Sequence, residues 1–449
     1  MHKTIEKFFR PCSPKIPLYL FLAGIAVYIV LFFPGKLSAD SSVIYAQALA
    51  HNYSDHHPPM MGYVWHYLNM LIPGPAIFFL LNVFLIWGCM YWLAFRIFHK
   101  QIIACWIMIL PFMPQVLIYA GWVWKDLIFS YGYLFVGLYL AERHINKTPI
   151  KIWHLPILCL FVFFATAVKF QAQFILPLLL LWFFQVYGKQ NAWRYKKTKS
   201  VVGTIIAWFA ILTGIEHTNN FITHTRGHGS DHSWQYVKIF DLAGMSIRTQ
   251  KMLIPKEIFA RPDVSVKDLE EKWELTWDPL ITSENAPLRS TQTEAEREKL
   301  LSVWWENVLY HPVDYLQFRI SIWYEGIIGA APSKNYIENN LFLQSPWIKK
   351  ILLCIASLFA YIVILPLHIG FLILGYMVNR KQRDANGYAQ SLMMITSMGL
   401  MLAFILLFKS LAATPRYICF TFATFYFALP FAVKCLQLLT SKDHKQQIS

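Results

Sequence analysis

The sequence predicts an all-α polytopic membrane protein with about ten transmembrane helices. Of the 449 residues, 56% are hydrophobic and only 14% are charged, whereas soluble domains carry roughly 25% charged residues. The apolar residues form long continuous runs and do not alternate with polar ones. This pattern favours helices over a β-barrel, the other structure that satisfies its own backbone inside a bilayer. Lysine and arginine are concentrated between alternate runs, as they are in cytoplasmic loops.

Ten apolar runs are long enough to cross the hydrocarbon core, which requires about 20 residues per helix. Two of them, 127–143 and 171–188, are near the lower length limit. Because no small-residue cleavage site follows the first run, we expect a retained first span and not a signal peptide. The expected spans are 17–35, 74–97, 102–121, 127–143, 153–169, 171–188, 200–216, 350–377, 389–408 and 418–438.

The distribution of basic residues predicts the orientation of these spans. Lysine and arginine are frequent in every second connecting segment, so these segments are expected on the cytoplasmic side, together with both termini. The segments 36–73, 122–126, 217–348 and 409–417 then lie on the outer side. This topology and contacts with anionic lipid account for most of the net charge of +15. We therefore expect the lipid bilayer, and no nucleic acid, as a partner.

The chain is expected to form an N-terminal transmembrane module (1–216), an outer domain (217–348) and a C-terminal transmembrane module (349–449). The outer domain is small and mainly helical by residue spacing, and Thr291 with Glu294 resembles a capping box at the start of one helix. In the first outer loop, MMGYVWHYLNML mixes aromatic and apolar residues as an interfacial helix does. The cysteines lie outside the long polar loops, so neither a disulfide framework nor a cysteine metal site is expected.

The densest polar chemistry follows the first span. Asp40 lies just beyond that span, where a carboxylate that is wet on one side and shielded on the other suits a general base. The alternative is a helix cap, because the surrounding SADSS is rich in capping residues. Asp55, His56 and His57 precede two prolines, which end one helix and fix the start of the next. These three side chains could orient a phosphate, a metal ion or a sugar, or could form only a polar turn.

Charged residues also mark the other outer turns. Lys125 and Asp126 form either an ion pair with each other or two separate contacts, the lysine with an anionic substrate and the aspartate with a metal ion or an acceptor. Arg416, beside Tyr417, carries a guanidinium that matches phosphate oxygens. Its alternative role is to reach lipid headgroups. Two further lysines on the same predicted face are Lys169 and Lys409.

The stretch 217–235 has no clear helical period and is expected to be a loop. It contains four histidines whose spacing would gather metal ligands on a helix, but Gly227 and Gly229 argue against a helix there. The histidines are His217, His224, His228 and His232. The sequence contains no Walker loop, nucleophile elbow, HExxH motif or dinucleotide fingerprint, so energy input from a nucleotide has no support.

Taken in order, these motifs resemble the GT-C superfamily of polytopic glycosyltransferases. The resemblance is strongest to the branch that contains the protein O-mannosyltransferases and the lipid A aminoarabinose transferases. It covers essentially the whole chain in topology, but only short motifs in sequence. The motifs are Asp40 with Tyr45, the His57-Pro58-Pro59 turn, the Lys125-Asp126 pair and the Arg416-Tyr417 pair.

The resemblance implies a GT-C-like helix arrangement and a sugar transferase with a polyprenyl-phosphate donor. The acceptor would be a lipid, a glycan or a protein. Asp40 matches the catalytic acid of the family, His57 and Pro58 match its His-Pro step, and Arg416 matches its phosphate-side arginine. Many members carry a second acid beside the first, whereas Ser41 follows here, so the resemblance leaves a divalent metal ion open.

In the expected reaction, Asp40 accepts a proton from the acceptor hydroxyl while basic side chains stabilise the leaving phosphate. The basic side chains are Arg416, Lys125, Lys169 and Lys409. We expect the protein in a bacterial inner membrane. The alternative classes are a flippase or exporter of lipid-linked oligosaccharide and an O-antigen polymerase or ligase.

Overall fold

The computed structural model describes residues 2–227, 230–325, 345–347, 350, 361–381, 386–412 and 415–446. These residues form helices joined by turns and isolated β-bridges, without a named strand among them. The chain divides into two compact units. The bundle unit comprises Met1–Gly229, Ala331–Ala403 and Ile418–Ser449, and the small unit comprises Ser230–Ala330 and Phe404–Tyr417.

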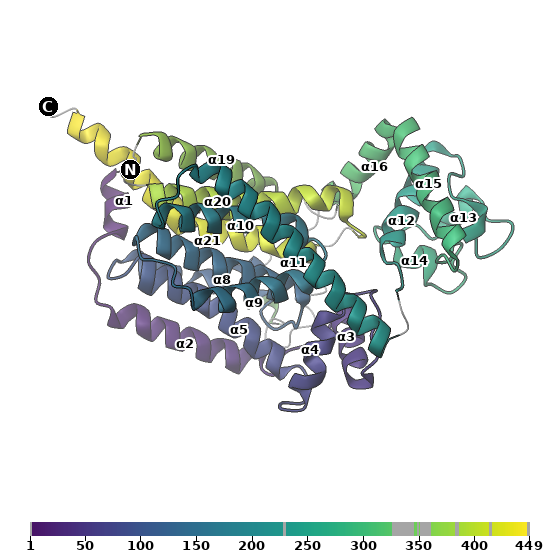
Figure 1. Ribbon diagram of the computed structural model, residues 1–449, viewed down its shortest axis with the longest axis horizontal. Helices are drawn as coiled ribbons and strands as arrows, with labels where there is room; N and C mark the ends of the chain where they lie inside the picture. Colours follow the sequence, from purple (N-terminus) through teal and green to yellow (C-terminus); the bar gives the residue numbers. More distant parts are fainter. Residues whose placement is uncertain are drawn as a thin grey trace. The chain divides into compact units, whose positions relative to one another are not determined.

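Among the described residues, seven helices are long and apolar enough to cross a membrane, which indicates a helical membrane protein. Several are labelled in Figure 1. The seven segments are Lys15–Phe32 (α2), Ala76–Ile97 (α5, Ala76–Tyr91, continued by η1, Trp92–Ile97), Ala172–Gln190 (α10), Lys196–Arg226 (α11), Val363–Lys381 in α19 (Tyr361–Lys381), Gly387–Lys409 in α20 (Asn386–Lys409) and Arg416–Thr440 in η7 (Pro415–Ile418) and α21 (Cys419–Gln446).

The described residues therefore give seven such helices where the sequence predicted ten. The predicted span 102–121 is broken into α6 (Ile103–Ile107), η2 (Leu110–Phe112) and α7 (Pro114–Leu117). Pro111 and Pro114 explain the breaks, because proline lacks the N–H that continues a helix. The predicted span 153–169 corresponds to α9 (His154–Ala167), which has only 14 residues. The predicted span 127–143 corresponds to α8 (Lys125–Ile145), which is likewise not among the seven. Part of the predicted span 350–377 lies outside the described residues, and the helix Val363–Lys381 at this span is one of the seven.

Helix α8 (Lys125–Ile145) is the most enclosed element of the bundle unit. It corresponds to the predicted span 127–143 and packs against α5, α9, α10 and α21. Nearly all of its side chains are buried, including the polar Asp126, Ser130 and Glu142. The first turn of α8, which carries Lys125 and Asp126, is therefore held in place by four surrounding helices.

Two short helices follow α2 and pack against each other. They are α3 (Ala39–Ala50) and α4 (Met60–Asn69), and α4 matches the predicted interfacial helix. A further short helix, α1 (His2–Phe8), precedes α2 and packs against α21. Helix α4 thus holds the segment between α2 and α5 against the long helices α5 and α11.

The prediction of a loop over residues 217–235 was wrong for residues 217–226, because α11 continues to Arg226 as one helix of 31 residues. Figure 1 shows α11 as a single long rod. Thr218 and Thr223 donate their hydroxyl protons to carbonyl oxygens one turn earlier, which satisfies these polar side chains within the helix. The helix ends at Arg226, and its C-cap is Gly227, the first glycine after Gly214.

The small unit is built from short helices around its own apolar core. The core includes Phe240, Leu269, Leu300 and Phe318, and Leu411 of the 404–417 segment packs against it. The helices are α12 (Trp234–Thr249), η3 (Lys256–Ile258), α13 (Val266–Glu271), α14 (Asp278–Ile281), α15 (Glu294–Tyr310) and α16 (Pro312–Trp323). The 404–417 segment thus contributes to this core although it lies far from the helices in sequence.

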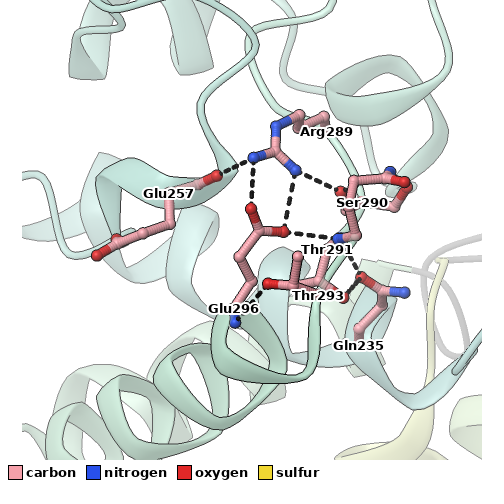
Figure 2. Close-up of polar contacts among 8 residues, drawn as sticks. Gln235, Glu257, Arg289, Ser290, Thr291, Thr293 and Glu296 are labelled. Atoms are coloured by element: carbon pink, nitrogen blue, oxygen red, sulfur yellow. Dashed lines mark hydrogen bonds and ion pairs between the residues drawn. The ribbon is translucent and has the colours of Figure 1, made fainter.

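The capping box predicted at Thr291 and Glu294 does not form, and the helix is capped two residues later by Thr293. Thr293 caps α15 by accepting the backbone N–H of Glu296, whereas Thr291 is buried and bonds to Gln235 of α12. Figure 2 shows both contacts, together with Arg289, which donates two hydrogen bonds to the Glu296 carboxylate. These bonds lower the pKa of Glu296 to about 2. The start of α15 is therefore fixed by a charged network that reaches α12.

Candidate functional site

A short backbone pairing brings the segment after α2 to the segment before α8. The N–H of Lys36 donates to the Gly121 carbonyl at 2.8 Å, and the N–H of Val123 donates to the Lys36 carbonyl at 3.0 Å. Ser38 and Ser41 then form a capping box that starts α3. One alternative from the sequence was that Asp40 caps a helix. Ser38 is the cap of α3 instead, and Asp40 lies in the first turn of that helix. This pairing brings the starts of α3 and α8 close together.

Asp40, Lys125 and His57 come together at this point. All three were predicted from the sequence as residues of one site. The Lys125 Nζ lies 3.9 Å from Asp40 Oδ2 and 2.8 Å from His57 Nδ1. Because an ammonium donates, His57 accepts at Nδ1 and carries its proton on Nε2. The Asp40 side chain is 27% exposed and that of Lys125 is 11% exposed. The carboxylate is thus partly shielded but still accessible, as a general base for an incoming hydroxyl must be.

Asp126 forms a second ion pair beside the first. Its carboxylate contacts the Nζ of Lys169, and both side chains are only 4% exposed. Asp126 also lies in the first turn of α8, where the helix dipole favours a negative charge. Lys125 and Asp126 therefore do not pair with each other, because each has an ion-pair partner from another segment. The predicted contacts with an anionic substrate and with a metal ion or an acceptor stay predictions.

The Cys419 thiol lies next to this second pair. Its Sγ is 3.4 Å from the Ser130 Oγ and 3.9 Å from the Asp126 carbonyl oxygen. Cys419 follows Arg416 by three positions and opens α21. The start of α21 is thus fixed against the start of α8.

The Asp55-His56-His57 turn is tied to α3. Gln47 of α3 donates to the Ser54 Oγ at 3.0 Å, and the same oxygen accepts the backbone N–H of His56 at 3.4 Å. The rings of His56 and His57 lie 4.8 Å apart. Pro59 directly precedes α4, so the prolines start the next helix as predicted. Asp55 lies in this turn and is half-buried.

Tyr45 has a structural contact and is not part of the Asp40 cluster. Its hydroxyl donates to the Asn69 Oδ1 at 2.9 Å, and its ring lies 4.9 Å from that of Trp65. Both partners belong to α4, so Tyr45 joins α3 to α4. These contacts give Tyr45 a packing role, and its place in a substrate site stays a prediction.

Lys409, Arg416 and Tyr417 belong to the small unit, whereas the other predicted site residues belong to the bundle unit. Lys409 ends α20 and is exposed. Arg416 lies in η7, with its guanidinium carbon 5.2 Å from the centre of the Tyr417 ring. The Arg416-Tyr417 pair is therefore a cation stacked on a ring.

The three histidines of the predicted metal group that the structure describes do not form a site that could hold a metal ion. His217 and His224 lie on α11, His232 follows that helix, and His228 is outside the described residues. Among the residues that the structure describes, no three His, Cys, Asp or Glu side chains gather in a way that could hold a metal ion.

A cluster of aromatic rings that was not predicted from the sequence lies beside the site. The His51 and His66 rings stack at 3.9 Å, and the Tyr53 ring lies edge-on to His51. Burial and the neighbouring His66 and Arg226 lower the pKa of His51. The backbone of Tyr53 also pairs with the end of α11, since its N–H donates to the Arg226 carbonyl at 2.8 Å. The spacing of Tyr63 and Tyr67 by one helical turn was the sequence signal for this cluster.

Comparisons with protein-family models, with curated proteins and with solved structures give no match for this chain.

Proposed function

We propose that this chain is a membrane glycosyltransferase of the GT-C type. It would transfer a sugar from a polyprenyl-phosphate donor to an acceptor hydroxyl at the outer face of a bacterial inner membrane. The observation that carries the proposal is the contact of Asp40 with Lys125, which also binds His57. These residues come from three separate segments, and each belongs to a motif of the resemblance.

Asp40 acts as the general base in the proposed reaction. Its carboxylate accepts the proton of the acceptor hydroxyl, whose oxygen attacks the anomeric carbon of the sugar. The bond between that carbon and the phosphate oxygen breaks, and the electron pair leaves with the polyprenyl phosphate. Proton transfer by a positioned side chain contributes about 10²–10⁴-fold in rate. Lys125 places a positive charge beside the base and, through His57, holds the 54–57 turn next to it.

The leaving phosphate needs cations, because its negative charge develops in the transition state. We assign this role to Lys125, whose Nζ lies 3.9 Å from Asp40 Oδ2. Phosphate binding by Arg416 and Lys409, which belong to the small unit, stays a prediction. Lys169 is already paired with Asp126 in a buried position. We therefore assign Lys169 to fixing Asp126 and the first turn of α8, and the earlier prediction that it binds phosphate directly stays a prediction.

A divalent metal ion does not fit well at Asp40. The Lys125 ammonium lies 3.9 Å from Asp40 Oδ2, so a metal ion bound to this carboxylate would be repelled by a neighbouring cation. No step of the proposed reaction is therefore assigned to a metal ion.

The test is an assay of the purified full-length chain with a panel of polyprenyl-phosphate sugars and a hydroxyl acceptor. Release of free polyprenyl phosphate is expected for one sugar, and Asp40→Asn is expected to abolish it. Asp263→Asn, at a highly exposed aspartate of the small unit, serves as the matched control. Movement of a labelled lipid across vesicles without any release of polyprenyl phosphate would instead support a flippase.

A further inference from the structure

Two cysteines that are far apart in sequence lie side by side in the bundle unit. Cys12 lies in the α1–α2 linker (residues 9–14), and Cys105 lies in α6, 93 positions later. Their Sγ atoms are 3.7 Å apart. Both cysteines are free thiols and are half-buried, so a small molecule can reach them.

Backbone hydrogen bonds hold the α1–α2 linker against the chain that leads into α6. The N–H of Cys12 donates to the Lys100 carbonyl at 2.9 Å, and the N–H of Ile102 donates to the Arg10 carbonyl at 3.0 Å. The two bonds run in opposite directions between the same two segments. The backbone of Cys12 is therefore fixed close to the start of α6.

The position of Cys105 follows from this pairing. Pro11 and Gln101 form an antiparallel bridge between the two segments, and Cys105 follows Gln101 by about one helical turn. Because helical side chains point back toward the N-terminus of their helix, the Cys105 thiol is directed toward the linker. The backbone thus brings the two thiols together without a contribution from the rest of the fold.

Contacts of aromatic rings fix the linker on both sides. The Phe8 ring at the end of α1 lies edge-on to the Trp106 ring of α6, with the ring centres 6.1 Å apart. The Lys434 Nζ of α21 lies 4.5 Å from the centre of the Phe9 ring. Helix α1 itself packs against α21. These contacts keep Cys12 beside Cys105.

The distance between the thiols is short enough for a disulfide bond to form. Because the two sulfurs are 3.7 Å apart and a disulfide bond is about 2.05 Å long, they need to approach each other by only roughly 1.7 Å. Rotations about the Cα–Cβ bonds of the two cysteines supply a movement of this size.

We propose that Cys12 and Cys105 form a thiol–disulfide switch, which a peroxide oxidises and a dithiol reductant restores. In the first step, the Cys12 sulfur attacks one oxygen of hydrogen peroxide, the O–O bond breaks, and a sulfenic acid forms with release of one water. In the second step, the Cys105 sulfur attacks the Cys12 sulfur, the S–O bond breaks, and a second water leaves. The two thiols lose two electrons and two protons, and one hydrogen peroxide is reduced to two waters.

The order of attack follows from the surroundings of Cys105. Burial and the contact with Cys12 raise the pKa of Cys105 to about 11. Since the thiolate is the reactive form of a cysteine, we assign the first attack to Cys12 and the second to Cys105. A dithiol reductant reverses the reaction by thiol–disulfide exchange and itself becomes a disulfide.

The expected topology places the α1–α2 linker on the cytoplasmic side, where disulfides are rare and those that form are usually transient or redox-sensing. The switch therefore rests in the reduced state and is oxidised only under peroxide stress. Oxidation ties the linker covalently to α6. Neither cysteine is assigned a role in the proposed sugar transfer, so the switch does not depend on the transferase proposal.

The test treats the purified full-length chain in lipid nanodiscs with hydrogen peroxide, blocks the remaining thiols and maps the peptides by mass spectrometry without reduction. A peptide linked through Cys12 and Cys105 is expected, and dithiothreitol is expected to remove the link. Cys12→Ser and Cys105→Ser should each lose the linked peptide. Cys159→Ser, at an exposed cysteine of the same unit, is the matched control and should keep it.

Thermal unfolding supplies a second measurement. A disulfide that closes a long loop restrains the unfolded chain, so the oxidised wild type is expected to melt roughly 5–10 °C above the reduced wild type. This shift should be absent from Cys12→Ser. If Cys105→Ser does not fold, Cys12→Ser decides both measurements, because Cys12 lies in the linker and not in a helix.

Three outcomes overturn the proposal. If peroxide leaves Cys12 and Cys105 as thiols or converts them to sulfinic acids, with no linked peptide, the two sulfurs do not react with each other. If Cys12 is linked to Cys159 or to a second copy of the chain, a different pairing is formed. If the protein is fully linked through Cys12 and Cys105 but melts at the temperature of the reduced protein, the bond does not restrain the linker.

Discussion

The buried pair of Asp126 and Lys169 gives a prediction that separates a structural lysine from a phosphate-binding one. Replacing Lys169 with Met leaves the Asp126 carboxylate buried without its cation, since both side chains are only 4% exposed. Breaking a buried pair from one side costs about 3–5 kcal/mol, whereas replacing both partners by apolar residues is often neutral. At about 2 °C per kcal/mol, Lys169→Met should lower the melting temperature by roughly 5–10 °C. The double variant Lys169→Met/Asp126→Leu should melt near wild type.

The assay is thermal unfolding in lipid nanodiscs, followed by tryptophan fluorescence, together with binding of polyprenyl phosphate at a temperature where every variant is folded. The double variant is expected to keep its affinity for polyprenyl phosphate. If the double variant melts near wild type but loses this affinity, Lys169 contacts the phosphate and its assignment as a structural residue is refuted. If Lys169→Met melts like wild type, the pair does not have the buried contact on which the estimate depends.

Two further predictions concern stability. A Cβ at Gly227 would lie 1.9 Å from the Tyr53 carbonyl oxygen, so Gly227→Ala should cost about 1–3 kcal/mol of unfolding free energy, measured by thermal unfolding. Gly370→Ala is the control, because no atom lies within 4 Å of its added Cβ, and equal melting of the two variants would contradict the prediction. The pKa of Glu296 is lowered to about 2 by Arg289, so its contribution to stability is complete above pH about 4.5 and is lost as the pH falls toward 2. Unfolding between pH 5 and 2.5 should show a weaker pH dependence in Glu296→Gln, and an unchanged slope would refute the assignment.

The long helices were predictable because their residues are apolar over lengths that match a bilayer. The predictions that were wrong concern segments in which the local sequence pattern indicates one structure and packing favours another. The polar residues 217–226 give no apolar period, yet α11 continues through them with its threonine hydroxyls bonded to its own carbonyls. At the start of α15, both Thr291 and Thr293 stand three residues before a glutamate. The contact of Thr291 with Gln235 of α12 decides between them, and no local pattern contains it.

The candidate site was predictable in its residues but not in its pairings. From the sequence alone, Lys125 and Asp126 could equally form an ion pair with each other or make two separate contacts. The outcome depends on the backbone pairing of Lys36 with the 121–123 segment, which places Asp40 beside Lys125. Two segments so far apart in sequence are brought together by packing of the helices between them, and periodicity carries no information about that.

The central claim is that the Asp40 carboxylate removes the proton from the acceptor. The most direct measurement is single-turnover transfer by Asp40→Asn in the donor panel, with bound polyprenyl phosphate measured in parallel. We predict a rate about 10²–10⁴-fold below wild type, with unchanged folding and an unchanged affinity for polyprenyl phosphate. If the variant transfers sugar at the rate of the wild-type protein, Asp40 is not the general base.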